Sequence, residues 1–176
     1  MTVRKILEIP DPMLRDVSAP LTAVDDGVRT LIADMFETMY DAPGIGLAAI
    51  QIGVPSRVVV IDLQEPETEG GEGVRRPRAF VNPEVVEAST TLQTYNEGCL
   101  SIPEQYGEVT RPDRVRARWL DEAGAAHEEG LDGLLAICLQ HEIDHLDGVL
   151  FIDHLSKLKR DMLVKKLAKY RREQRA

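Results

Sequence analysis

The chain has 176 residues, of which 43% are hydrophobic and 29% are charged, and its formal net charge is −9. This composition is typical of a folded domain and not of a disordered or nucleic-acid-binding chain, so we expect a single domain over residues 1–176. No apolar run approaches the ~20 residues of a membrane span, and the N-terminus lacks the apolar core of a signal peptide. We therefore expect a cytoplasmic protein.

The first half of the chain predicts one helix and one buried strand. Apolar residues recur at helical spacing over residues 25–40, and Pro43-Gly44 ends this helix. Residues 58–61 are four consecutive β-branched residues, which favour a buried strand. The sequence from 64 to 78 is rich in Glu, Gly and Pro and predicts a solvated loop.

Further strands are expected in the middle of the chain. Apolar pairs at residues 80–81 and 85–86 indicate two strands, interrupted by Asn82-Pro83. Residues 114–120 alternate charged and apolar side chains, and a turn sequence follows at residues 121–124. This pattern predicts a β-hairpin.

Two more helices are expected in the last third of the chain. The first covers residues 132–146 and stops at Gly148. The residues that share one of its faces are Leu134, Cys138, His141 and His145. Ser156 can cap the second, whose apolar side carries Leu163, Leu167 and Tyr170. This element order predicts an α+β fold, with antiparallel or mixed β-sheets wrapped around the central helix and a helix at the C-terminus.

The strongest chemical signal is His141-Glu142-Ile143-Asp144-His145. Two histidines four residues apart on a helix direct two ring nitrogens to one point, and the glutamate between them can act beside a metal ion without binding it. The same face carries Leu134 and Cys138, so the histidines are expected to be buried. Buried histidines need partners, and a metal ion supplies one.

A catalytic metal site needs a third protein ligand and an open position. Some H-E-x-x-H proteases take this ligand downstream, but Phe151 stands where their histidine would be. The downstream residues of ligand type are Asp147, Asp153, His154, Asp161 and Glu173. Upstream, Cys99 in the segment 97–101 offers a thiolate, which is a strong ligand for zinc or ferrous iron. It is the better candidate and completes a Cys-His-His set.

A third segment, residues 44–51, reads Gly-Ile-Gly-Leu-Ala-Ala-Ile-Gln. It contains G-x-G-x-x-A, but a dinucleotide fingerprint requires a preceding strand, and here a helix and Pro43 precede the glycines. No nucleotide cofactor is therefore expected. The small residues would let a peptide lie against the backbone, and the amide of Gln51 could donate a hydrogen bond to a developing oxyanion.

Together the three segments resemble peptide deformylases, whose motifs have the form G-x-G-x-A-A-x-Q, E-G-C-L-S and H-E-x-D-H. They stand here in the family's order at residues 44–51, 97–101 and 141–145. The likeness continues through residues 101–105, 133–138 and the C-terminal helix, as in bacterial members. Tyr106 departs from the arginine of some relatives, which puts a contact with the substrate backbone in doubt.

The resemblance implies an enzyme that removes the N-formyl group from formyl-methionine at the start of nascent polypeptides and releases formate. It implies that Cys99, His141 and His145 bind one divalent metal ion, usually Fe²⁺ in this family, while Zn²⁺, Ni²⁺ or Co²⁺ also suit the ligands. It further implies that Glu142 is the general base and acid. Gln51 and the backbone N–H of Leu100 would form the oxyanion site.

Binding of the methionine side chain requires an apolar pocket next to the metal. Family likeness and the helix face together suggest that this part of the substrate is bound by Ile45, Gly46, Gly98, Leu100, Ile137 and Cys138. Read from the residues alone, the apolar members of this set are ordinary core residues. Glu97 and Asp144 could orient site groups with Arg111 as an ion partner, or form ordinary surface pairs.

Other functions would leave parts of the pattern unused. An H-E-x-x-H metallopeptidase would take a downstream ligand and leave Cys99 idle. A structural metal module would close the coordination sphere with a fourth side chain, for which Cys138 and His127 are the candidates. A thiol hydrolase using Cys99 would not explain Glu142 and the second histidine.

The C-terminal segment is basic, whereas the rest of the chain is acidic. Residues 157–176 carry a net charge of +7, against −16 for the rest of the chain. They form either a solvated amphipathic helix packed on the body or a docking surface for ribosomal RNA or protein near emerging chains.

Overall fold

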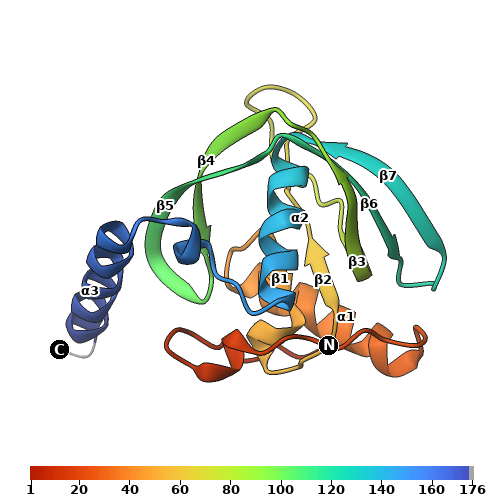
Figure 1. Cartoon of the computed structure of the whole chain (residues 1–176). Helices are drawn as coiled ribbons and strands as arrows, with labels where there is room; N and C mark the ends of the chain where they lie inside the picture. Colours follow the sequence, from red (N-terminus) through yellow and green to blue (C-terminus); the bar gives the residue numbers. More distant parts are fainter. Residues whose placement is uncertain (175–176) are drawn as a thin grey trace.

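The computed structural model describes residues 1–174 and has an α+β architecture (Figure 1). Strands curve around one central helix, α2, as the sequence predicts. The helices and 3-10 turns are η1 (Pro12–Arg15), α1 (Asp26–Asp41), η2 (Ala49–Ile52), α2 (Gly133–Leu146), η3 (Phe151–His154) and α3 (Lys157–Gln174). The strands are β1 (Gly46–Ala48), β2 (Val58–Ile61), β3 (Arg78–Ala88), β4 (Leu92–Cys99), β5 (Ile102–Pro112), β6 (Arg114–Leu120) and β7 (Ala126–Asp132).

The strands form two antiparallel sheets. Five pair in the order β1-β2-β3-β6-β7, and β4 pairs with β5 in a separate two-stranded sheet. Figure 1 shows α2 between these layers, with β4 and β5 on one side and β3, β6 and β7 on the other. Both sheets can therefore present side chains to the same helix.

Helix α2 lies at the centre of the molecule because it carries apolar residues on more than one side. Ala136, Leu139 and Leu146 are buried and pack in an apolar cluster with the five-stranded sheet, whereas the buried Ile137 lines a pocket. A helix with apolar residues on several sides is stable only when it is enclosed. Gly148, with φ of 74°, follows the helix end. A Cβ atom there would collide with the carbonyl of Arg15, so this position requires glycine.

Helix α1 forms where the sequence predicts it. The Asp25 carboxylate accepts a hydrogen bond from the backbone N–H of Val28 at 2.9 Å and caps the helix start. Its buried face, which includes Ile32, Met35 and Met39, packs with β1 and β2 in a second apolar cluster. This packing fixes the C-terminal end of α1 next to Gly44.

The prediction of two short strands around Asn82-Pro83 is wrong, because β3 is one strand of 11 residues. The register with β6 shifts between Val81 and Glu84, so the two residues form a β-bulge and not a break. Asn82 adopts φ of 52°. Its side chain bonds both the N–H and the carbonyl of Leu21, at 2.8 and 2.7 Å, and these contacts hold the bulge in place.

The predicted hairpin and the C-terminal helix are both present. Strands β6 and β7 pair along their whole length around the turn at residues 121–124. Ser156 Oγ accepts a hydrogen bond from the N–H of Lys159 at 3.3 Å at the start of α3. Leu163 and Leu167 of α3 are buried in an apolar cluster that also contains Ile102 and Val109 of β5. Arg175 and Ala176 of the expected basic helix lie outside the described residues.

Within residues 1–174, no helix has the length and apolar character needed to cross a membrane.

Candidate metal centre

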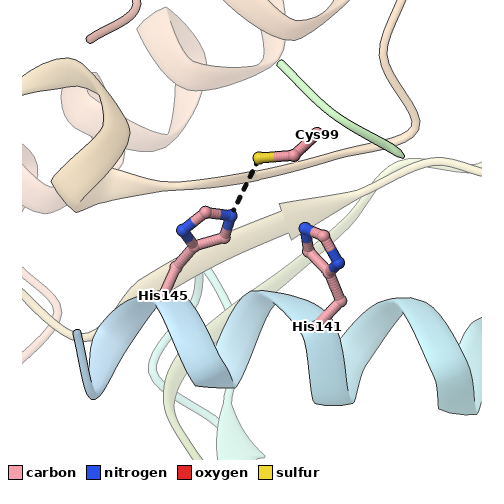
Figure 2. Close-up of side chains that lie close together, drawn as sticks. All are labelled: Cys99, His141 and His145. Carbon is pink, nitrogen blue, oxygen red and sulfur yellow. Dashed lines mark hydrogen bonds between the residues drawn. The ribbon is translucent and has the colours of Figure 1, made fainter. Parts of the chain in front are cut away.

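Three donor atoms meet beside α2. The ligand atoms of Cys99, His141 and His145 all lie within 4.8 Å of one another. Figure 2 shows the two imidazoles on successive turns of α2, with the thiol of Cys99 facing them across the site. The Sγ atom of Cys99 is 3.3 Å from Nε2 of His145. The structure thus brings together the Cys-His-His set named from the sequence.

The thiol reaches the helix because of a local irregularity in the β4–β5 sheet. The register shifts between Gly98 and Cys99, so that Cys99 pairs with Ile102 across a tight turn at residues 100–101. A Cβ atom on Gly98 would lie 2.6 Å from the ring of Tyr106. Glycine therefore allows the tyrosine ring to cover the backbone next to Cys99.

A buried charge network orients His141. Its Nδ1 atom lies 2.8 Å from Oε2 of Glu97, which leaves Nε2 to face the site. Arg111 binds both oxygens of Glu97, at 2.6 and 3.1 Å, and also Oδ2 of Asp144 at 2.8 Å. Glu97 and Arg111 are 4% and 5% exposed. The contacts suggested from the sequence for Glu97, Asp144 and Arg111 are therefore present as a buried network, not as a surface pair.

The network extends to His154, which sequence reasoning considered only as a distant ligand. Its Nε2 atom lies 2.8 Å from the same Oδ2 of Asp144. Burial raises the pKa of Glu97, but hydrogen bonds from His141 and Arg111 outweigh this effect and lower the pKa to about 2. Glu97 is therefore ionised at any physiological pH and holds His141 in one tautomer.

The remaining downstream candidates lie away from the cluster. Asp147 pairs with Arg57, Asp153 with Arg15, and Glu173 with Lys169. Asp161 is exposed on α3. His127, one of the two side chains considered for closing a structural site, bonds Asp121 at 2.7 Å and stacks on Trp119. Among the residues that the structure describes, no fourth His, Cys, Asp or Glu joins the group. Three ligands with an open position are typical of a catalytic site.

An unpartnered carboxylate oxygen indicates that the cluster is built for a cation. Across residues 1–174, Oε2 of Glu142 is among the buried side-chain atoms that have no hydrogen-bond partner, which is costly unless another group satisfies it. Burial, followed by the nearby His141, lowers the pKa of His145, so this ring is neutral, as a ligand must be. For His141, burial lowers the pKa, but hydrogen bonds with Cys99 and Glu97 outweigh it and raise the pKa. A cation would displace that proton.

Glu142 lies beside the ligands on α2 and is 5% exposed. Burial raises the pKa of its carboxyl group from 4.5 to about 7. A Cβ atom on Gly46 would come within 2.5 Å of Oε1 of Glu142 and 2.9 Å of Sγ of Cys138. Only glycine at position 46 therefore lets β1 approach the carboxylate so closely. A buried carboxyl group with a pKa near neutrality is suited to accept and return a proton.

The side chain of Gln51 is fixed next to Cys99. It is 1% exposed, and its Oε1 accepts a hydrogen bond from the N–H of Ala48 at 2.9 Å. Its Nε2 therefore points toward the site, where it donates to Oγ of Ser101 at 3.0 Å and lies 3.6 Å from Sγ of Cys99. Sequence reasoning missed Ser101 as the partner of Gln51, although it stands within the same motif as Cys99.

These groups open into a pocket of about 630 Å³. The residues named from the sequence that line it are Ile45, Gly46, Gln51, Gly98, Cys99, Leu100, Ile137, Cys138, His141 and Glu142. His145 is 1% exposed and does not contribute to the lining, so it lies on the buried side of the cluster. Leu134 and Tyr106 also line the pocket. The sequence had placed Leu134 on the helix face of the histidines and had left a substrate contact at Tyr106 in doubt. Tyr95 of β4 lines the pocket too and was not named from the sequence, because only its long-range placement reveals this role.

The sequence matches a family model described as polypeptide deformylase over residues 3–161. It is 66% identical to a peptide deformylase of Rhizorhabdus wittichii over 176 residues, which cover 100% of this chain and 99% of that protein. It is 59% identical to a peptide deformylase of Zymomonas mobilis over 172 residues, which cover 98% and 97% of the two chains.

The solved structures that this chain resembles are also peptide deformylases. A peptide deformylase from Legionella pneumophila superposes with a TM-score of 0.89 at 46% identity, covering 98% of each chain. A peptide deformylase from Ehrlichia chaffeensis in complex with actinonin superposes with a TM-score of 0.88 at 41% identity, covering 97% of this chain and 98% of that one.

Proposed function

Since this chain belongs to the peptide deformylase family, and is therefore a hydrolase that removes the N-formyl group from nascent polypeptides, we propose a role for each residue of the site. Cys99, His141 and His145 hold the metal ion, and Glu142, Gln51 and the N–H of Leu100 act on the formyl group. The observation that carries this assignment is the convergence of three donor atoms beside a buried carboxylate with one unpartnered oxygen.

A divalent metal ion held by these ligands would supply Lewis acidity, which polarises the formyl carbonyl and makes a water molecule acidic near neutral pH. Glu142 accepts the proton of the attacking water. It then returns this proton to the nitrogen of methionine as the bond to the formyl carbon breaks. Its burial next to Gly46 keeps bulk water away from the proton that it carries.

The oxyanion that forms on the formyl oxygen needs donors that are already in place. Nε2 of Gln51 has no freedom to turn away, because Ala48 holds the other end of the amide. The backbone N–H of Leu100, in the turn next to Cys99, is the second donor. Donors fixed before the reaction stabilise the developing charge without a cost for reorganisation.

The methionine side chain binds in the apolar part of the pocket. The apolar residues of its lining include Ile137 and Cys138 of α2 together with Ile45 and Leu100. Gly46 and Gly98 line the same pocket and offer their backbone to the peptide. Because β1 is an edge strand and Gly46 lines the pocket, the substrate can pair with its free edge as an added strand.

The decisive experiment is anaerobic assay of formate release from a formyl-Met tripeptide, with metal-loaded protein and a metal-free control. Metal-dependent release of formate with an otherwise intact peptide supports the assignment. Cleavage of an internal peptide bond without release of formate would instead indicate that the protein is an H-E-x-x-H metallopeptidase.

We propose Fe²⁺ as the native metal, with Zn²⁺, Ni²⁺ and Co²⁺ as ions that the same ligands accept. One thiolate and two imidazoles suit all four ions. Metal analysis after anaerobic purification from cells tests this proposal, because ferrous iron bound through a thiolate is lost when oxygen is admitted. A full complement of zinc under these conditions would contradict it.

We also propose that α3 docks on the ribosome, in the cytoplasm where formylated chains emerge. Leu163 and Leu167 anchor the helix on β5, while Lys165, Lys166 and Lys169 are exposed. Replacing these three lysines by glutamate should abolish salt-sensitive co-sedimentation with ribosomes and leave formate release from a tripeptide unchanged. Co-sedimentation at wild-type level would refute the docking role of α3.

A further inference from the structure

Asp62 is a buried carboxylate that the proposed chemistry does not use. It follows the last residue of β2 and is 1% exposed. One oxygen accepts a hydrogen bond from the hydroxyl of Tyr40, at the C-terminal end of α1, at 2.6 Å. The other accepts two, from the backbone N–H groups of Gln64 and Arg76, both at 3.0 Å. Asp62 thus joins α1, the end of β2 and both ends of the loop at residues 63–77.

The same residue also bonds the wall of the catalytic pocket. The backbone N–H of Asp62 donates to the carbonyl of Ile45 at 2.9 Å. Gln64 Nε2 donates to the carbonyl of Gly44 at 3.3 Å. Gly44, Ile45 and Gly46 all line the pocket and lead into the edge strand β1. The position of this wall therefore depends on the position of Gln64, which the Asp62 carboxylate fixes.

Gln64 needs this support because its backbone is strained. Its φ of 52° lies in the left-handed region, which costs free energy for a residue with a side chain. A charge-assisted hydrogen bond from its N–H to Asp62 can offset this cost. Tyr40 is held by a second contact as well, because the guanidinium of Arg75 lies over its ring, 3.9 Å from the ring centroid. Burial and the hydrogen bond to Asp62 raise the pKa of Tyr40, so the phenol remains a donor at assay pH.

We propose that Asp62 is a positioning residue for substrate binding, whose carboxylate holds the segment from Gly44 to Gly46 against the formyl-methionyl chain. Its role depends on the proposed function, because this wall contacts the substrate only if the pocket receives such a peptide. Asp62 does not touch the metal ligands or Glu142 by any hydrogen bond among the described residues. Its loss should therefore weaken binding and leave the chemical step intact.

The test is Asp62→Asn in the metal-loaded enzyme, compared with the wild type on one formyl-Met tripeptide. All three groups that bind the carboxylate are donors, and an amide offers only one acceptor oxygen. We expect KM to rise about tenfold, as for the loss of a hydrogen bond to a charged group, with kcat and metal content unchanged. Amide hydrogen exchange at Gln64 and Arg76 should become faster.

Asp34→Asn is the matched control. Asp34 is the comparably buried carboxylate of α1, 3% exposed, which binds Arg4 and the N–H of Thr2 and does not line the pocket. This variant should lose stability without a change in KM. An equal rise of KM in both variants, or a KM within about twofold of the wild type in folded Asp62→Asn, would overturn the proposal.

Gln64→Ala provides an independent test if Asp62→Asn does not fold. It removes only the contact with the carbonyl of Gly44 from a half-buried side chain. KM should rise about threefold, as expected for the loss of one neutral hydrogen bond, and kcat should stay unchanged. An unchanged KM would overturn the proposal that Gln64 connects Asp62 to the pocket wall. Because wild-type formate release is measured in the same series, failure of the proposed function is distinguished from failure of this inference.

Discussion

Substitution of Glu142 by glutamine should separate the proposed catalytic function of this residue from its effect on folding. Burial raises the pKa of the Glu142 carboxyl from 4.5 to about 7 in the metal-free protein. A folded-state pKa above the unfolded value means that the folded protein prefers the protonated carboxyl. The penalty for ionising it is therefore absent well below pH 4.5, grows between pH 4.5 and 7, and is complete above pH 7.

This pKa corresponds to a penalty of about 3 kcal/mol at pH 8, and to less than about 1 kcal/mol at pH 5. Glutamine has nearly the same shape and no charge, so metal-free Glu142→Gln should be more stable than the metal-free wild type at pH 8. At pH 5 the two proteins should be nearly equal. A bound divalent cation favours the carboxylate, so the advantage of the variant should shrink in the metal-loaded protein.

Urea unfolding of the metal-free proteins at pH 5 and pH 8, followed by circular dichroism, measures this difference. The metal-loaded variant should retain its metal but lose at least about a hundredfold in kcat, the usual contribution of a general base. A stability difference that does not vary with pH would show that Glu142 is ionised freely in the folded protein. Near-normal turnover would falsify its assignment as the base.

Two further variants test the metal centre and its support. Cys99→Ser should fold but lose bound metal on dialysis, because a hydroxyl is a far weaker ligand than a thiolate; metal content equal to that of the wild type, measured by elemental analysis, would remove Cys99 from the ligand set. Arg111→Met should leave Glu97 and Asp144 uncompensated and lower the free energy of unfolding by about 3–5 kcal/mol. It should also weaken metal affinity by roughly 10- to 100-fold through the loss of orientation of His141, and unchanged affinity in a competition assay with a chelator would contradict this.

The sequence predicted those parts of the fold in which local pattern and tertiary burial agree. Helix α2 has side chains that share one face at helical spacing and Gly148 after its end, and it forms within one residue of the expected bounds. The run of β-branched residues at 58–61 forms β2. In both elements, the residues that favour the local structure are also the residues that the core buries.

Strands β4 and β5 were not predicted because their pattern is weak. Five consecutive residues of β4, from Leu92 to Asn96, are exposed, so no apolar alternation marks the strand. Its stability comes from pairing with β5 along the whole strand, which is a long-range property. The error at Asn82-Pro83 has a related origin. A bulge held by Leu21, 61 residues away, cannot be told from a break by its sequence alone.

Some features of the candidate site follow from the local sequence, and others depend on contacts between distant parts of the chain. The spacing of His141, Glu142 and His145 is fixed by one helix, so their common direction follows from the sequence. The orientation of the His141 ring does not follow from the local sequence, because it depends on a contact with Glu97. The charge of Glu97 is in turn compensated by Arg111 from the neighbouring strand. An isolated carboxylate at 4% exposure would be costly. The burial of the proposed metal ligands thus depends on two strands that bring opposite charges to the same point. This dependence explains why a poorly patterned hairpin lies against α2, the most apolar of the three α-helices that the structure describes.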